Sequence, residues 1–179
     1  MKQRNLIFTK ALKTLVLVAF FSTFTACVVD KDDDTPVEEE VTFRVELLKI
    51  RALEIKEGEG DNLEIYGKIG SKLVRGNLTE DNPLWTQADT EALPVGLSDY
   101  PLSAVVTYTV ATANIASSNL IVEADLFDYD GGGTNAPEDL GKEAITTPLS
   151  SITSSVTYDI VLNDSSGQFV QVTYSITRI

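Results

Sequence analysis

Alternation of apolar and polar side chains from residue 41 onward restricts the fold of this chain more than any other feature. Phe43, Val45 and Leu47 begin the pattern, and Leu48 and Ile50 change its phase, as a β-bulge allows. Five further segments alternate in the same way: 63–69, 104–110, 120–126, 156–162 and 170–176. A period of two residues is that of a β-strand with one buried face, and no segment has the period of a long helix.

Shorter strands and turns complete this pattern. We predict short strands at 73–78, 93–97 and 140–146. Turns are predicted at Gly70-Ser71 and at Asp81-Asn82-Pro83, because these residues favour turns. A chain of about eight strands in ~140 residues predicts an all-β protein, an antiparallel β-sandwich. The strongly alternating last strand indicates that the C-terminus is part of a sheet.

The first 26 residues form a separate segment. They contain four basic residues and no acidic one, and a short apolar run at 15–21 is followed by small or polar residues. A basic region, a short hydrophobic region and small residues, in this order, indicate a secretory signal peptide. The apolar run is much shorter than the ~20 residues of a membrane-spanning helix. We therefore predict that residues 1–26 are a signal peptide.

Cys27, the one cysteine of the chain, comes directly after this segment. Phe24-Thr25-Ala26-Cys27 resembles the lipobox of bacterial lipoproteins, with Phe24 at a position where Leu is commoner. The resemblance implies cleavage before Cys27 and a lipid, such as palmitate, on its side chain. Several acyl chains would anchor the protein stably, because each buried methylene contributes about 0.8 kcal/mol. An ordinary signal peptide with an incidental cysteine is the alternative.

An acidic segment follows the cysteine. The residues from Asp30 to Glu40 include seven acidic side chains, one lysine and one proline. This composition predicts an extended, solvated tether. Lys31-Asp32-Asp33-Asp34 also resembles the surface-export signal of Bacteroidetes lipoproteins, which implies display on the cell surface. A plain spacer is the alternative.

The predicted organisation has three parts: the signal peptide (1–26), the lipidated cysteine with its tether (27–41), and the β-sandwich domain (42–179). Cleavage removes four of the 14 basic residues and none of the 27 acidic ones, which leaves a net charge of −17. Such a charge repels nucleic acid, so no nucleic-acid partner is expected. The expected location is the outer membrane, reached through the lipid anchor on Cys27.

Two acidic loops are the candidates for a binding site. The first contains Glu57, Glu59 and Asp61, and the second follows the predicted strand 120–126. Its acidic side chains are Asp128, Asp130, Glu138 and Asp139, with three glycines after Asp130. Hard oxygen ligands from a flexible loop suit Ca²⁺, which takes roughly six to eight oxygens. Solvated turn residues are the alternative, because Asp and Gly are common in turns.

These loops also resemble those of a known family. The stretch from Leu120 to Asp130, followed by Glu138-Asp139-Leu140-Gly141, looks like the segment of C2 domains in which a strand runs into an Asp-x-Asp calcium loop. The stretch 52–69 similarly looks like the first calcium loop of that family. The second loop is longer than usual for C2 domains, and Glu57 and Glu59 stand where C2 calcium sites favour Asp.

The resemblance implies a C2-like sandwich with both calcium loops at one edge. It implies that Asp128 and Asp130 are the central calcium ligands, two residues apart at the end of a strand. Asp61 and either Glu138 or Asp139 would be their partners from facing loops.

The composition excludes several kinds of catalysis. The chain has no histidine, which excludes a histidine base, a Ser-His-Asp triad and histidine-ligated zinc. A single cysteine excludes an internal disulfide. Paired carboxylates, Asp128 or Asp130 with Glu59 or Asp61, are the remaining basis for a hydrolase. We expect no enzymatic activity, and a carboxylate hydrolase is the weakest alternative.

Trp85 follows Asn82-Pro83-Leu84 and is expected just after a turn. It either binds a ligand by stacking or closes the open end of the sandwich. Together these features predict a cell-envelope lipoprotein with a non-catalytic C2-like sandwich and calcium in its loops. Its role would be structural or adhesive, with an unknown protein or glycan partner. The alternative is capture of a glycan or peptide near Trp85 in a nutrient-uptake system.

Overall fold

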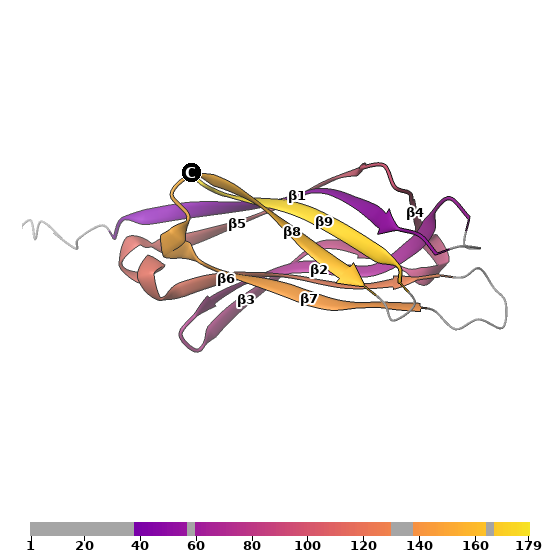
Figure 1. Cartoon of the computed structure of the whole chain (residues 1–179). Helices are drawn as coiled ribbons and strands as arrows, with labels where there is room; N and C mark the ends of the chain where they lie inside the picture. Colours follow the sequence, from indigo (N-terminus) through magenta and orange to yellow (C-terminus); the bar gives the residue numbers. More distant parts are fainter. Residues whose placement is uncertain (1–37, 57–59, 130–137, 164–166) are drawn as a thin grey trace, which may run out of the picture. The chain divides into compact units, whose positions relative to one another are not determined.

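The computed structural model describes residues 38–56, 60–129, 138–163 and 167–179. Within this part, nine strands form two antiparallel sheets that stack as two layers (Figure 1). The first sheet has the order β5-β1-β9-β8. Its strands are β1 (Glu40–Glu54), β5 (Tyr100–Ala111), β8 (Ser155–Asn163) and β9 (Phe169–Arg178).

The second sheet has the order β3-β2-β6-β7, with β4 also paired to β2. Its strands are β2 (Leu63–Arg75), β3 (Leu78–Gln87), β4 (Leu93–Val95), β6 (Ser118–Asp128) and β7 (Glu138–Pro148). Three short 3-10 helices, Asp89–Glu91, Thr112–Ser117 and Leu149–Ser151, lie in the connections. Among the described residues, no helix has the length and apolar character of a membrane span. The expected fold class, an all-β antiparallel sandwich, is confirmed.

Alternating residues of both sheets fill the interior, as the sequence pattern requires. In β6 every second residue from Ser118 to Asp128 is buried and the residues between them are partly exposed. Burial of this apolar face provides the main free energy of folding. One polar contact crosses the core: the hydroxyl groups of Tyr108 in β5 and Ser71 in β2 lie 2.7 Å apart and are buried.

Two details of the first sheet agree with the sequence. The pairing of β1 with both neighbours shifts register between Leu47 and Lys49, so the predicted bulge is confirmed. The last strand, β9, lies between β1 and β8, which confirms that the C-terminal segment belongs to a sheet. Strand β1 begins at Glu40, two residues before the expected start of the domain at residue 42.

The two turns predicted between residues 70 and 83 are wrong. Strand β2 runs through Gly70-Ser71 without interruption, and Asp81-Asn82-Pro83 lies inside β3. The hairpin turn lies instead at Gly76, which has φ +57° and thus favours a residue without a Cβ. Proline is tolerated in β3 because this strand is at the edge of the sheet, where the missing N–H leaves no ladder bond unmade.

Candidate functional site

Asp128 ends β6 and points to the inside of the sandwich. Its side chain belongs to the buried face of the strand, and the residue is only 1% exposed. One carboxylate oxygen, Oδ1, accepts a hydrogen bond of 2.7 Å from the backbone N–H of Glu64 in β2. The carbonyl of Glu64 in turn accepts a bond of 2.9 Å from the N–H of Tyr129. Asp128 therefore caps the end of the β2–β6 pairing, and its carboxylate has a structural role there.

Glu138 and Asp139 begin β7 and lie on opposite faces of the sheet. Glu138 is directly opposite Asp128 in the β6–β7 ladder, whereas Asp139 is opposite Phe127 on the outer face. Each carboxylate already has a partner. Glu138 lies 3.9 Å from the ammonium group of Lys56, and Oδ1 of Asp139 accepts a 2.8 Å bond from the N–H of Gly141.

The described acidic residues do not make a calcium site by themselves. Asp61 is exposed in the loop before β2. Asp130, with Glu57 and Glu59 of the first acidic loop, lies outside the described residues, as does Cys27. Within the described part of the chain, no three acidic or cysteine side chains are grouped to hold a metal ion. Of the predicted set, Asp128 and Glu138 share one face of the sheet and Asp139 lies on the other. A backbone N–H donates to one oxygen each of Asp128 and Asp139.

Trp85 lies inside β3, opposite Ile69 of β2. It is half-buried and packs against the hydrophobic core. Trp85 therefore does not follow a turn, as expected, but lies within an edge strand and packs on the core from there. Its neighbours Pro83 and Thr86, however, line a pocket on the other face of the same sheet.

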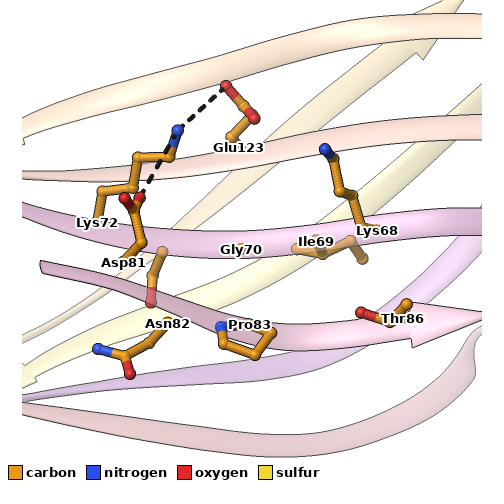
Figure 2. A pocket seen from close by; sticks show the side chains of 10 residues that line it. Lys68, Ile69, Gly70, Lys72, Asp81, Asn82, Pro83, Thr86 and Glu123 are labelled. Atoms are coloured by element: carbon orange, nitrogen blue, oxygen red, sulfur yellow. Dashed lines mark ion pairs between the residues drawn. The ribbon is translucent and has the colours of Figure 1, made fainter.

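This pocket has a volume of about 250 Å³ and is open to solvent on the outer face of β2 (Figure 2). The sequence did not predict it. Gly70 lies at the middle of its floor, in a strand where neighbouring outward positions carry Lys68 and Lys72. The β2–β3 pairing shifts register at this point: Ile69 is opposite Trp85, whereas the next residue, Gly70, is opposite Pro83. We name this depression the Gly70 pocket.

Charged side chains of three strands surround the Gly70 pocket. The ammonium nitrogen of Lys72 lies 3.7 Å from Oδ1 of Asp81 on β3 and 4.0 Å from Oε2 of Glu123 on β6, as Figure 2 shows. Both distances exceed those of direct N–H···O hydrogen bonds, which are roughly 2.7–3.2 Å. The ammonium nitrogen of Lys68 similarly lies 3.8 Å from Oδ2 of Asp125 on β6.

Lys142, a residue outside the pocket lining, holds the carboxylate of Glu123 in place. Its Oε1 lies 2.9 Å from the ammonium nitrogen of Lys142 on β7. This hydrogen bond is the largest cause that lowers the pKa of Glu123, and the charges of Lys72 and Lys142 add to it while burial opposes it. Glu123 is therefore a stable carboxylate acceptor. A general acid needs the opposite, a raised pKa.

An aromatic cluster lies on the same outer face, beyond Lys68. The rings of Tyr66 and Phe127 stack at 5.2 Å, and Tyr129 meets Tyr66 edge-on at 6.5 Å. Partial burial, followed by the negative charges of Asp89, Asp128 and Asp139, raises the pKa of Tyr66. Tyr66 thus stays a neutral phenol, and the cluster gives the face an apolar end beside its charged middle.

The sequence carried one signal for the Gly70 pocket. In the segment 63–69 and its continuation, lysines occupy outward positions four residues apart with a glycine midway. The interpretation of Gly70-Ser71 as a turn concealed this spacing. The contributions of Asp81, Pro83 and Glu123 depend on pairing across strands and have no signal in the linear sequence.

No family model and no curated protein matches this chain. Several solved structures are similar to it. A C2 domain of plant Extended Synaptotagmin 1 is 9% identical, with 77% of this chain and 93% of that chain covered and a TM-score of 0.43. Human GIVD cytosolic phospholipase A2 is 8% identical, with a TM-score of 0.40. The match covers 79% of this chain but only 18% of the phospholipase chain.

A pair of C2 domains from Extended-Synaptotagmin 2, described as calcium bound, is 14% identical. That match covers 77% of this chain and 42% of the other, with a TM-score of 0.33. The two stacked sheets of the described residues by themselves show a β-sandwich. TM-scores below 0.5 support no inference about its ligand or activity.

Proposed function

We propose that this chain is a lipoprotein of a bacterial cell envelope, held at the outer membrane by a lipid on Cys27 and displayed on the cell surface. Its sandwich is a non-catalytic interaction module. The observation that carries the proposal is the place of Cys27. The single cysteine stands directly after a basic, then apolar, then small-residue segment, and an acidic tether leads from it to the sandwich. An acylated Cys27 would tether the module without any membrane-spanning helix.

Labelling with a palmitate analogue in cells tests the anchor. We expect the wild-type chain to take up the label and to partition with the membrane fraction. Cys27→Ala should abolish both results, whereas Ser22→Ala in the same signal segment should leave them unchanged. Equal labelling of the Cys27→Ala chain would contradict the lipid anchor.

Surface display has a separate test, because it depends on the acidic tether and not on the lipid. Proteinase K added to intact cells should digest the wild-type chain. Replacement of Asp32, Asp33 and Asp34 by Asn should protect the chain from digestion while palmitate labelling continues. Protection of the wild-type chain would place it on the inner side of the membrane.

Calcium binding remains a prediction of the sequence and not part of this proposal. The described residues do not fit the ion, since Asp128 and Glu138 share one face while Asp139 lies on the other. The prediction therefore depends on residues outside the described part, Asp130 first among them.

A second candidate function is ligand capture, and the Gly70 pocket favours it. Trp85 was the residue expected to capture the ligand, but it packs on the core, and the open depression lies on the opposite face of its strand. A module that captures a glycan or peptide for uptake would use this face. The charges there balance, in contrast to the net charge of −17 that the mature chain would carry.

A further inference from the structure

We propose that the Gly70 pocket binds one neutral sugar residue of a glycan, through hydroxyl groups placed between Lys72 and the carboxylates of Asp81 and Glu123. This inference rests on the second candidate function, ligand capture, and it is independent of the lipid anchor. It names the class of ligand and the residues that select it.

Gly70 is a glycine at a position where a side chain would fit, beside the register shift between β2 and β3. A Cβ at this position would meet only the carbonyl oxygen of Asn82, at 3.6 Å, which is an ordinary contact. Glycine inside a strand costs roughly 0.5–1 kcal/mol relative to alanine. A strand glycine often marks a bulge or a place where a ligand approaches the backbone closely, and Gly70 lies beside a register shift with an open pocket above it. Here the missing side chain keeps the floor of the pocket open.

Gly67, three residues earlier in β2, shows what a structurally required glycine looks like. Its φ is +121°, and a Cβ there would lie 2.3 Å from the carbonyl oxygen of Asp125. Real side chains do not tolerate either condition. The same strand thus contains one glycine that the backbone needs and one, beside the β2–β3 register shift, where a Cβ would fit.

The distances around Lys72 favour hydroxyl groups as the ligand's polar atoms. The ammonium group faces two carboxylates at 3.7 and 4.0 Å, too far for direct hydrogen bonds. A hydroxyl group between such partners accepts from the ammonium and donates to the carboxylate, as bridging water does. Neighbouring hydroxyls of a sugar can do this toward Asp81 and Glu123 at once.

Charge and size define the ligand further. Two lysines and two acids line the pocket, so it offers donors and acceptors without net charge. An anionic ligand is opposed by the acidic domain as a whole, and a neutral ligand can use the donors and acceptors of the pocket equally. The volume of about 250 Å³ is smaller than the ~300–1,000 Å³ of drug-sized sites and suits a single ring. The ring of Pro83 supplies an apolar wall for the carbon face of a sugar.

The test is calorimetric titration of the purified full chain, in a detergent without a sugar headgroup, with neutral oligosaccharides of glucose, mannose, xylose and galactose. We expect at least one to bind with a Kd of roughly 10 μM to 1 mM. Gly70→Val fills the pocket and should weaken binding at least about tenfold, while the thermal midpoint stays equal or rises, since valine favours strands. That midpoint separates a blocked pocket from a misfolded domain.

Lys72→Met should also weaken binding at least about tenfold, because it removes the donor between the two carboxylates. Lys49→Met is the matched control. Lys49 is similarly exposed (34% against 37%) and pairs with Asp99, but it lies on β1 of the other sheet. Binding to this variant should equal that of the wild-type chain.

Three results would overturn the proposal: no neutral oligosaccharide binds at millimolar concentration, binding survives in Gly70→Val and Lys72→Met, or only peptides or acidic polysaccharides bind. A repeat with the Cys27→Ala chain keeps the two proposals apart. Sugar binding without palmitate labelling would refute only the anchor, and labelling without sugar binding would refute only the pocket.

Discussion

Asp128, Glu138 and Asp139 lie at one end of the second sheet, which we call the loop edge. The loop edge and the Gly70 pocket both involve β2 and β6, but their carboxylates have different partners. At the loop edge, the backbone N–H groups of Glu64 and Gly141 donate hydrogen bonds to carboxylate oxygens of Asp128 and Asp139, respectively. In the pocket, Lys72 faces its carboxylates at distances too long for direct hydrogen bonds. Acidic side chains near a strand end therefore do not by themselves indicate a ligand site. Their role depends on whether the local backbone has already satisfied them.

The largest expected effect separates the two glycines of β2. Gly67→Ala should lower the free energy of unfolding by about 3–5 kcal/mol, through the positive φ and the clash with Asp125. In a domain of this size that corresponds to a fall of roughly 10–20 °C in the thermal midpoint. Gly70→Ala should instead raise stability by about 0.5–1 kcal/mol. Calorimetric unfolding measures both, and equal losses would show that Gly70 is also a backbone requirement.

A smaller effect is expected at the loop edge. Asp128→Ala should cost about 1–3 kcal/mol, because it leaves the N–H of Glu64 without its carboxylate acceptor at a part-buried position. Asp128→Asn keeps an acceptor oxygen and should cost less. Denaturant unfolding of both variants checks this order. If the two substitutions are equally harmful, the negative charge itself, and not the hydrogen bond, is what the loop edge needs.

The next effect is a pH dependence at the rim of the pocket. The pKa of Glu123 is lowered from its ordinary value of 4.5, chiefly by the hydrogen bond from Lys142. A lowered folded-state pKa contributes stability that is present above about pH 4.5 and is lost as the pH falls through the folded value. Lys142→Met should therefore lower the thermal midpoint at neutral pH, with a difference that shrinks as the pH falls below about 4.5 and through the folded-state pKa of Glu123. Lys142→Arg should behave like wild type. A difference that persists at low pH would assign the effect to packing.

The smallest effect is expected from calcium. The acids of the described residues do not converge on one point, so they alone predict no rise of the thermal midpoint in millimolar Ca²⁺ relative to Mg²⁺. The calcium prediction of the sequence needs Asp130, which lies outside them. A site filled to about 100 times its Kd would add about 2.7 kcal/mol, so the result is unambiguous. A clear rise that Asp128→Asn together with Asp130→Asn removes would restore the loop edge as a calcium site and reverse the comparison.

Most of the fold could be predicted from the sequence, because burial of one strand face produces alternation along the chain. The positions of β5, β6, β8 and β9 and the bulge after Leu47 followed from this pattern. Strand β3 could not be predicted in the same way. Asp81-Asn82-Pro83 has turn chemistry, and only its place at a sheet edge makes a strand acceptable there.

The period of two residues was enough to predict an all-β protein, and the absence of histidine excluded histidine chemistry. The order of basic, apolar and small residues before Cys27 predicted an exported, lipidated protein. All of these properties are local. The folded structure decides instead which carboxylates accept hydrogen bonds from backbone N–H groups and which lie beside a lysine. That choice follows from how the strands pair: neighbouring positions at the start of β7 put Glu138 and Asp139 on opposite faces, and the β2–β3 register shift places Gly70 opposite Pro83, between Lys72 and Glu123. Register joins residues far apart in the chain, and no local pattern records it.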